Sequence, residues 1–281
     1  MKKVKLILGL LLIFGIYSCS KNNVPLSTKV KILSKLEIQN IGIKHNEALG
    51  YVLEALKNSD ISKSKSPINM EMFINSKLNE FYTSVFIDPM ELKTAIMYSE
   101  KEGSKYIGSS NLENSFKNIS RDLSPIESAL NEYGQYLTSI QKDLLFQCNE
   151  AISGYSGGDP ATILNKLETI QGLAQDQLSV EEAQVIIIGA EIGKMSVIYW
   201  NENIEEWIQI LKNSQPNLKG WFSWGELAGA DVAGGVGAAV TTAIVNAVPG
   251  AGQVAYGAAV VGGAAGASVG DAIFQIWNEI F

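Results

Sequence analysis

The chain has 281 residues, of which 46% are hydrophobic, and a formal net charge of −7 at pH 7. This acidic balance argues against nucleic-acid binding, which depends on a basic surface, and it gives little attraction to anionic lipid. The length is enough for a sizeable apolar core in one large or two small domains.

Residues 1–18 are expected to be a lipoprotein signal peptide. Three lysines precede an uncharged apolar run from Leu6 to Tyr17, and Ser18 and Cys19 follow it, which is the order of a secretory signal. The ending resembles a bacterial lipobox, and this resemblance implies cleavage before Cys19 and lipidation of that cysteine. The alternative is an uncleaved N-terminal helix in which the cysteine is incidental.

Processing at this position changes the charge and the cysteine chemistry. Loss of the three positive charges takes the net charge from −7 to about −10. Acylation of Cys19 leaves Cys148 alone, so no internal disulfide is expected. Ser20 to Asn23 contains no acidic residue, whereas surface-exported lipoproteins of Bacteroidetes type usually carry an acidic stretch there. The expected location is therefore the bacterial envelope, on the periplasmic side of the outer membrane.

The body of the chain is predicted to be all-α, a helical bundle over residues 28–213 that follows a short tether at 19–27. Apolar residues recur at helical spacing along it. The expected stripes are Ile41, Leu49, Val52, Leu53 and Leu56; Ile68, Met72, Phe73, Phe81, Tyr82 and Val85; Leu130, Tyr133, Leu137, Ile140 and Leu144; and Ile163, Leu164, Leu167, Ile170 and Leu173.

Start signals and connectors divide this body. Ser124 to Glu127 and Ser179 to Glu182 have the pattern of capping boxes, and Asp159-Pro160 marks another helix start. The segment after the second box, Val185 to Trp200, is apolar almost all round, which is typical of a helix at the centre of a bundle. The expected connectors are Lys63 to Pro67, Lys101 to Asn111, Ser153 to Asp159, and Asn213 to Asn217.

Residues 214–281 are predicted to form a Gly/Ala-rich helical hairpin with its turn at Val248-Pro249-Gly250. From Val232 to Gly270 there is no charged residue, and small residues recur every four positions. Residues four apart share a helix face, and faces without side chains let helices approach closely, as in lipid. The predicted helix-packing residues are Gly229, Ala233, Gly237, Gly262, Gly266 and Gly270.

Each arm of the hairpin is just long enough to span a bilayer, which needs roughly twenty residues. Gly and Ala are only weakly apolar, so the driving force for insertion into a membrane is weak. Asp231 and Asp271 are expected on the same side, at its two open ends. Phe222 and Trp224 stand with Trp221 at its start, either as an interfacial aromatic belt or as core residues.

The tail resembles the glycine-zipper regions of class II bacteriocins in three stretches: Gly229 to Ala239, Pro249 to Gly252, and Gly262 to Gly266. The whole chain is similar to Bacteroidetes lipoproteins of unknown function, in which a segment like Ile41 to Leu49 precedes such a tail. The bacteriocin resemblance implies membrane insertion and permeabilisation.

Two glycine motifs imitate enzyme signatures without their context. Gly154 to Gly158 matches a hydrolase nucleophile elbow, but it follows a predicted helix, and the chain's single histidine lies upstream. Gly250 to Ala255 imitates a dinucleotide fingerprint, but too little chain follows to complete a sheet. A flexible loop and a helix–helix turn are the better interpretations.

His45 is expected to have a structural role near a helix start, where His45 and Asn46 cap or satisfy backbone groups. The alternatives are a general base, a dyad with Cys148, or a metal site with Glu47. No cluster has the spacing of metal ligands, so the sequence predicts no catalytic residue, metal or cofactor.

These features predict a non-enzymatic, lipid-anchored envelope protein whose hairpin packs in membrane or against partner helices, including self-association through Gly229 to Gly270. The alternatives are a bacteriocin-like permeabilising toxin and a soluble helical binding module that is held to the membrane only by its lipid.

Overall fold

The computed structural model of the chain describes residues 32–61, 67–107, 123–212, 222–247 and 255–280. Within these ranges the chain is all-α, as the sequence predicts, and contains no strand. The predicted signal peptide, Cys19, the tether, the connector after residue 212 and the hairpin turn at 248–250 lie outside the described residues.

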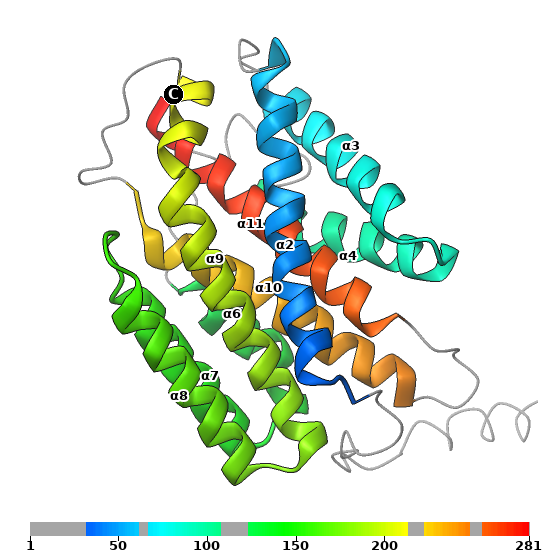
Figure 1. Cartoon of the computed structure of the whole chain (residues 1–281), viewed down its shortest axis with the longest axis vertical. Helices are drawn as coiled ribbons and strands as arrows, with labels where there is room; N and C mark the ends of the chain where they lie inside the picture. The colour runs from blue at the N-terminus through cyan, green and yellow to red at the C-terminus, as the bar shows by residue number, and fades with distance from the viewer. Residues whose placement is uncertain (1–31, 62–66, 108–122, 213–221, 248–254, 281) are drawn as a thin grey trace, which may run out of the picture.

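The bundle is built from long helices. In chain order they are α2 (Lys35–Lys57), α3 (Pro67–Val85), α4 (Pro89–Ile107), α6 (Pro125–Tyr133), the 3-10 turn η2 (Gly134–Tyr136), α7 (Ser139–Ser153), α8 (Ala161–Gln177), α9 (Val180–Lys212), α10 (Trp224–Ala247) and α11 (Tyr256–Ile280). In Figure 1, α2 and α9 lie side by side at the front, with α7 and α8 on one flank and α3 on the other, while α10 and α11 pass behind them.

Most helix starts follow the predicted capping chemistry. The Ser124 hydroxyl accepts from the backbone N–H of Glu127, whose carboxylate in turn accepts from the Ser124 backbone N–H. Ser179 and Glu182 make the same reciprocal pair at α9. Such pairs satisfy backbone donors that a helix start leaves without partners, so both predicted capping boxes are confirmed.

Three local predictions are wrong. The stripe from Leu130 to Leu144 is not one helix, because α6 ends at Tyr133 and Thr138 caps a new helix, α7. Residues 101–107, predicted as a connector, continue α4. On α3, Met72 is 67% exposed, and the buried face runs through Met70 and Ile74 instead.

Two apolar clusters meet along α9 and α10. One lies among α2, α3, α9 and the hairpin, and the other among α6, α7, α8 and α9. Adjacent α10 residues divide between them, with Leu227 in the first cluster and Ala228 in the second. A helix with a core on both sides must be apolar all round, which explains the composition of α9 and α10.

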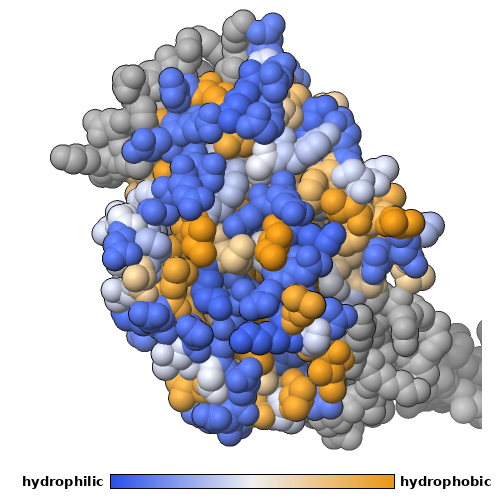
Figure 2. Space-filling model, viewed as in Figure 1, coloured by the Kyte–Doolittle hydropathy of each residue, from blue (hydrophilic) through white to orange (hydrophobic). Residues whose placement is uncertain are grey.

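The outer surface contrasts with this interior. The face of the bundle in Figure 2 is mainly hydrophilic, with apolar side chains in scattered small patches. Scattered apolar residues are normal on folded proteins in water. The helices that surround the hairpin therefore present an ordinary polar exterior on this face.

Burial on α2 predicts a sharp contrast between two of its leucines. Leu49 is fully buried and Leu36 is 75% exposed. We expect Leu49→Ala to lower the free energy of unfolding by roughly 2–5 kcal/mol, because it leaves a cavity. The control Leu36→Ala should stay within about 0.5 kcal/mol. Urea denaturation followed by circular dichroism measures both, and equal losses would contradict this core.

Candidate functional site

The Gly/Ala hairpin lies at the centre of the bundle rather than on its surface. In the most apolar window of α11, 94% of residues are buried, and α10 is buried almost throughout from Leu227 to Ala243. Two helices in the described ranges, α9 and α11, are long and apolar enough to cross a membrane by length and composition. Core helices of soluble proteins pass the same test, so this finding is weak evidence for a span.

One row of small residues on α11 is filled by α4. A Cβ atom at Gly262 would overlap the backbone carbonyl of Ala95, and one at Gly266 would overlap that of Ser99. At Gly270 it would lie 2.9 Å from the carbonyl oxygen of Gly103. The two backbones thus touch along three successive helical turns, which only residues without side chains allow.

The α4 side of this contact is a second row of small residues that sequence reasoning missed. Ala95, Ser99 and Gly103 are also spaced by four, and all are buried. The spacing is visible in the sequence. The row does not stand out, because α4 is otherwise amphipathic and Gly103 falls in the segment predicted to be a connector.

The other predicted row, on α10, faces α6. Gly229 lies beside Pro125, and a Cβ at Gly237 would come within 2.7 Å of the Tyr133 ring. Ala233 is buried between them, close to Ile126 of α6. On another side of α10, Gly234 meets Gly263 of α11. The six predicted packing residues therefore lie on helices of the same chain, facing α4 or α6.

A buried polar network ties four helices together at the hairpin. His45 on α2 and Asp231 on α10 are both fully buried, with 3.3 Å between Nε2 and Oδ2. The indole N–H of Trp200 on α9 lies 3.4 Å from Asp231 Oδ2 and 3.1 Å from the Ser268 hydroxyl on α11. Since every member is sealed from solvent, the network has no access to a substrate in this conformation.

His45 therefore does not cap a helix, which corrects the prediction. It lies in the middle of α2, whose cap is Ser34. Its Nδ1 lies 2.9 Å from Asn46 Oδ1, and the Asn46 amide donates to the carbonyl of Met195 on α9. Asn46 does satisfy a backbone group, as expected, but one on another helix.

A second buried acid fixes the start of the hairpin. Asp271 is fully buried and accepts a hydrogen bond of 2.7 Å from the Gln275 amide. Gln275 accepts from the backbone N–H of Ser223 at 2.8 Å and donates to its carbonyl at 3.2 Å. Asp231 and Asp271 thus belong to the interior.

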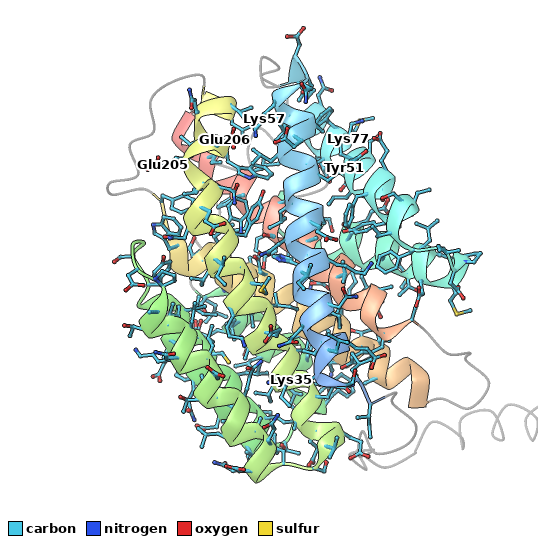
Figure 3. All side chains as sticks on the ribbon, in the orientation of Figure 1. Lys35, Tyr51, Lys57, Lys77, Glu205 and Glu206 are labelled. Carbon is cyan, nitrogen blue, oxygen red and sulfur yellow. The ribbon has the colours of Figure 1, made fainter. Side chains whose placement is uncertain are left out.

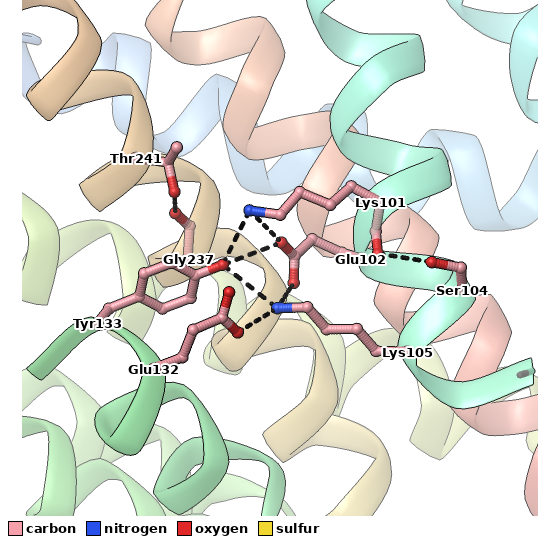
Figure 4. Close-up of polar contacts among 8 residues, drawn as sticks. All are labelled: Lys101, Glu102, Ser104, Lys105, Glu132, Tyr133, Gly237 and Thr241. Carbon is pink, nitrogen blue, oxygen red and sulfur yellow. Dashed lines mark hydrogen bonds and ion pairs between the residues drawn. The ribbon is translucent and has the colours of Figure 1, made fainter.

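A third cluster, drawn in Figure 4, joins α4 to α6 across α10. The buried Glu102 carboxylate is 2.8 Å from the Lys105 ammonium, which also reaches Glu132 at 2.7 Å. The Tyr133 hydroxyl donates to Glu102 at 3.4 Å and accepts from Lys101 and Lys105.

Electrostatics keeps the Tyr133 phenol and the Lys105 ammonium of this cluster protonated near neutral pH. Burial, with the charges of Glu102 and Glu132, raises the pKa of Tyr133, so the phenol stays protonated. Burial alone would lower the pKa of Lys105, but its ion pairs with the same two acids outweigh burial and raise it. The cluster therefore links α4 to α6 through ion pairs and hydrogen bonds.

The remaining motifs have structural roles. The segment 154–158 is a loop between two helices, so it is not a strand-to-helix elbow. Cys148 is buried in the cluster around α7 and α8, and burial raises the pKa of its thiol to about 12, which keeps it unreactive. Among the described residues, no group of three His, Cys, Asp or Glu side chains is placed to hold a metal ion.

Comparison of the chain with protein-family models, with curated proteins and with solved structures found no match. The interpretation of the site therefore rests on its geometry.

The α4–α11 contact predicts a large cost for one added methyl group. We expect Gly266→Ala to lower the free energy of unfolding by about 1–3 kcal/mol or more, because neither backbone can move independently of its helix. Gly172→Ala on α8 is the matched control, since nothing lies within 4 Å of its added Cβ. It should stabilise by about 0.5–1 kcal/mol. Chemical denaturation tests both signs, and a neutral Gly266→Ala would contradict the contact.

The buried pair predicts strong coupling between α2 and α10. We expect Asp231→Ala to lower the free energy of unfolding by about 3–5 kcal/mol, because it leaves His45 buried without its ion-pair partner, while the Trp200 N–H keeps Ser268 as acceptor. A double-mutant cycle with His45→Ala should give a coupling energy of about 0.5–3 kcal/mol. Additive losses would show that the two side chains do not interact.

Proposed function

We propose that this protein is a non-enzymatic, lipid-anchored helical protein of the bacterial envelope, whose glycine-zipper hairpin packs against helices of its own chain. The observation that carries the proposal is that the hairpin's small-residue rows are occupied by α4 and α6. Of the arrangements that the sequence leaves open, this contact favours the lipid-tethered module over a hairpin that resides in the bilayer.

Packing energetics supports this assignment. Gly/Ala helices are weakly apolar, and each glycine costs roughly 0.5–1 kcal/mol of helix stability against alanine, so they need a partner. Helices α4 and α11 supply that partner to each other through direct backbone contact at Gly262 and Gly266. Exposing the rows to lipid or to another protein would first require separating these helices.

The anchor in this proposal is the acylated Cys19, and the sequence supports it through the order of lysines, apolar run and Ser18-Cys19. Acyl chains hold a protein at a bilayer without any spanning helix. The proposed location is the periplasmic side of the outer membrane.

The state of the reactive side chains supports a non-catalytic role. His45 is fully buried against Asp231, and the Cys148 thiol is buried in an apolar cluster. Catalytic groups sit where a substrate can reach them, whereas these two are committed to the core.

A second candidate is a membrane-permeabilising protein, as the tail's resemblance to bacteriocins implies. One observation favours it: the apolar hairpin is central, and amphipathic helices enclose it. Such a fold would shield an apolar hairpin from water. The hairpin could enter a membrane only after the surrounding helices separate from it. Dye release from liposomes by the full-length protein tests this candidate, and it fails if no dye is released at micromolar protein.

The proposed function predicts that the lipid alone holds the protein to the membrane. We expect a chain that begins at Ser20, without the apolar signal segment and without Cys19, to be wholly soluble and to run as a detergent-free monomer, because its hairpin faces are filled internally. Cell fractionation with carbonate washing measures this. The matched control Cys148→Ala should stay membrane-bound like the unmodified protein.

One result would contradict this function. If the chain that begins at Ser20 remains in carbonate-washed membranes and needs detergent for release, the hairpin is inserted, and the lipid is not the sole anchor.

A further inference from the structure

An open groove of about 630 Å³ lies away from the buried hairpin contacts, between the α7–α8 loop, α9 and the start of α10. Ligand-binding clefts have volumes of roughly 300–1,000 Å³, so its size suits a small molecule. Its lining combines aromatic rings, an amide and a carboxylate: Tyr155, Asn201, Glu205, Phe222 and Trp224. The loop that carries the Gly154 to Gly158 motif and the start of α10, which Gln275 holds at Ser223, form two of its walls.

Three aromatic rings form a corner in this groove. The Trp224 ring stands at 72° to the Tyr155 ring, with centroids 5.5 Å apart, and at 88° to the Phe222 ring, with centroids 5.3 Å apart. Because the Tyr155 and Phe222 rings both stand nearly perpendicular to the Trp224 ring, the three rings present their faces or edges in different directions. Phe222 and Trp224 are half-buried, and they are residues for which the sequence left open a membrane belt or a core position.

The corner formed by the Tyr155, Phe222 and Trp224 rings is fixed in place by contacts with neighbouring residues. Gly157 has φ +88°, and a Cβ there would lie 3.0 Å from the Trp224 ring, so this close seating needs glycine. The Tyr155 hydroxyl lies 2.6 Å from Asn201 Oδ1 on α9. Ser223, between Phe222 and Trp224, is fixed by both of its backbone hydrogen bonds to Gln275. A site whose walls are fixed before binding loses less entropy when a ligand arrives.

The charge beside this corner is negative. Glu205 lines the groove, and no ion-pair partner is seen for it within the described parts of the chain. Its neighbour Glu206 is instead paired with Lys57 at 2.8 Å. Figure 3 shows Glu205 projecting from α9 on the side away from Lys57. Glu205 therefore remains available to a ligand that carries positive charge.

We propose that this groove binds an organic ammonium cation, which the Tyr155, Phe222 and Trp224 rings contact while Glu205 balances its charge. Cations are attracted to aromatic faces, and aromatic corners with a nearby acid suit alkylammonium groups. The chain's net charge of −7 adds long-range attraction for a cation. The proposal is independent of the lipid anchor and of the state of the hairpin.

Isothermal titration calorimetry on the folded, detergent-solubilised full chain tests it, with choline as the probe. Its uncharged isostere 3,3-dimethyl-1-butanol has the same shape without the charge. We expect choline to bind at least about tenfold more tightly than the isostere, since cation–π and ionic attraction require the charge.

Glu205→Gln should weaken choline binding at least about fivefold while leaving the circular dichroism spectrum unchanged, because the side chain is exposed. Glu202→Gln is the matched control. It removes the same charge from an exposed position on α9 that does not line the groove, and it should bind choline like the unmodified chain.

Three results would overturn the proposal: equal affinity for choline and its isostere, unchanged affinity in Glu205→Gln, or no heat of binding with choline at millimolar concentration. Tighter binding of a neutral sugar than of choline would likewise assign the groove to a different ligand class.

Discussion

Direct backbone contact between α11 and α4 is the constraint on which the rest of this bundle depends. Because Gly262 and Gly266 leave no room for even a methyl group, the two helices pack at short separation with their backbones in direct contact. That separation places α10 and α11 inside a shell made by α2, α3, α4, α6 and α9. It also explains why a tail composed largely of Gly, Ala and Val, a poor helix in isolation, is ordered in the folded chain.

Rows of small residues determine how closely two helices approach. Because such rows are nearly smooth, they do not determine which helix packs against them or at which axial position. Buried polar groups supply that choice in some proteins. Here each face of the hairpin has one: Asp231 binds toward α2 and α9, and Asp271 with Gln275 holds the start of α10. Glu102 and Tyr133 lock α4 to α6 over Gly237. We infer that these buried polar contacts select a single packing arrangement for the hairpin, although burying them costs free energy.

Much of this fold is local and could be predicted from sequence, because capping boxes and apolar periodicity depend on neighbouring residues. Ser124 and Ser179 begin helices as predicted. Tertiary partners could not be predicted in this way. The sequence predicts His45 near a helix start because its ion-pair partner Asp231 is distant in sequence. It predicts Gly103 in a connector because the need for glycine there comes from the contact with Gly270 on α11. The groove was missed for the same reason, since Tyr155, Glu205 and Trp224 come from three separate segments.

The central claim is that the hairpin's faces are filled by its own chain. Hydrogen–deuterium exchange of peptides from α11, measured on the chain that begins at Ser20 in buffer without lipid or detergent, tests it most directly. Core amides exchange only on global or near-global unfolding. The account predicts that residues 258–276 are protected as strongly as buried α9, and that liposomes do not increase this protection. Fast exchange in buffer, with protection appearing only when liposomes are added, would contradict the claim and place the hairpin in the membrane.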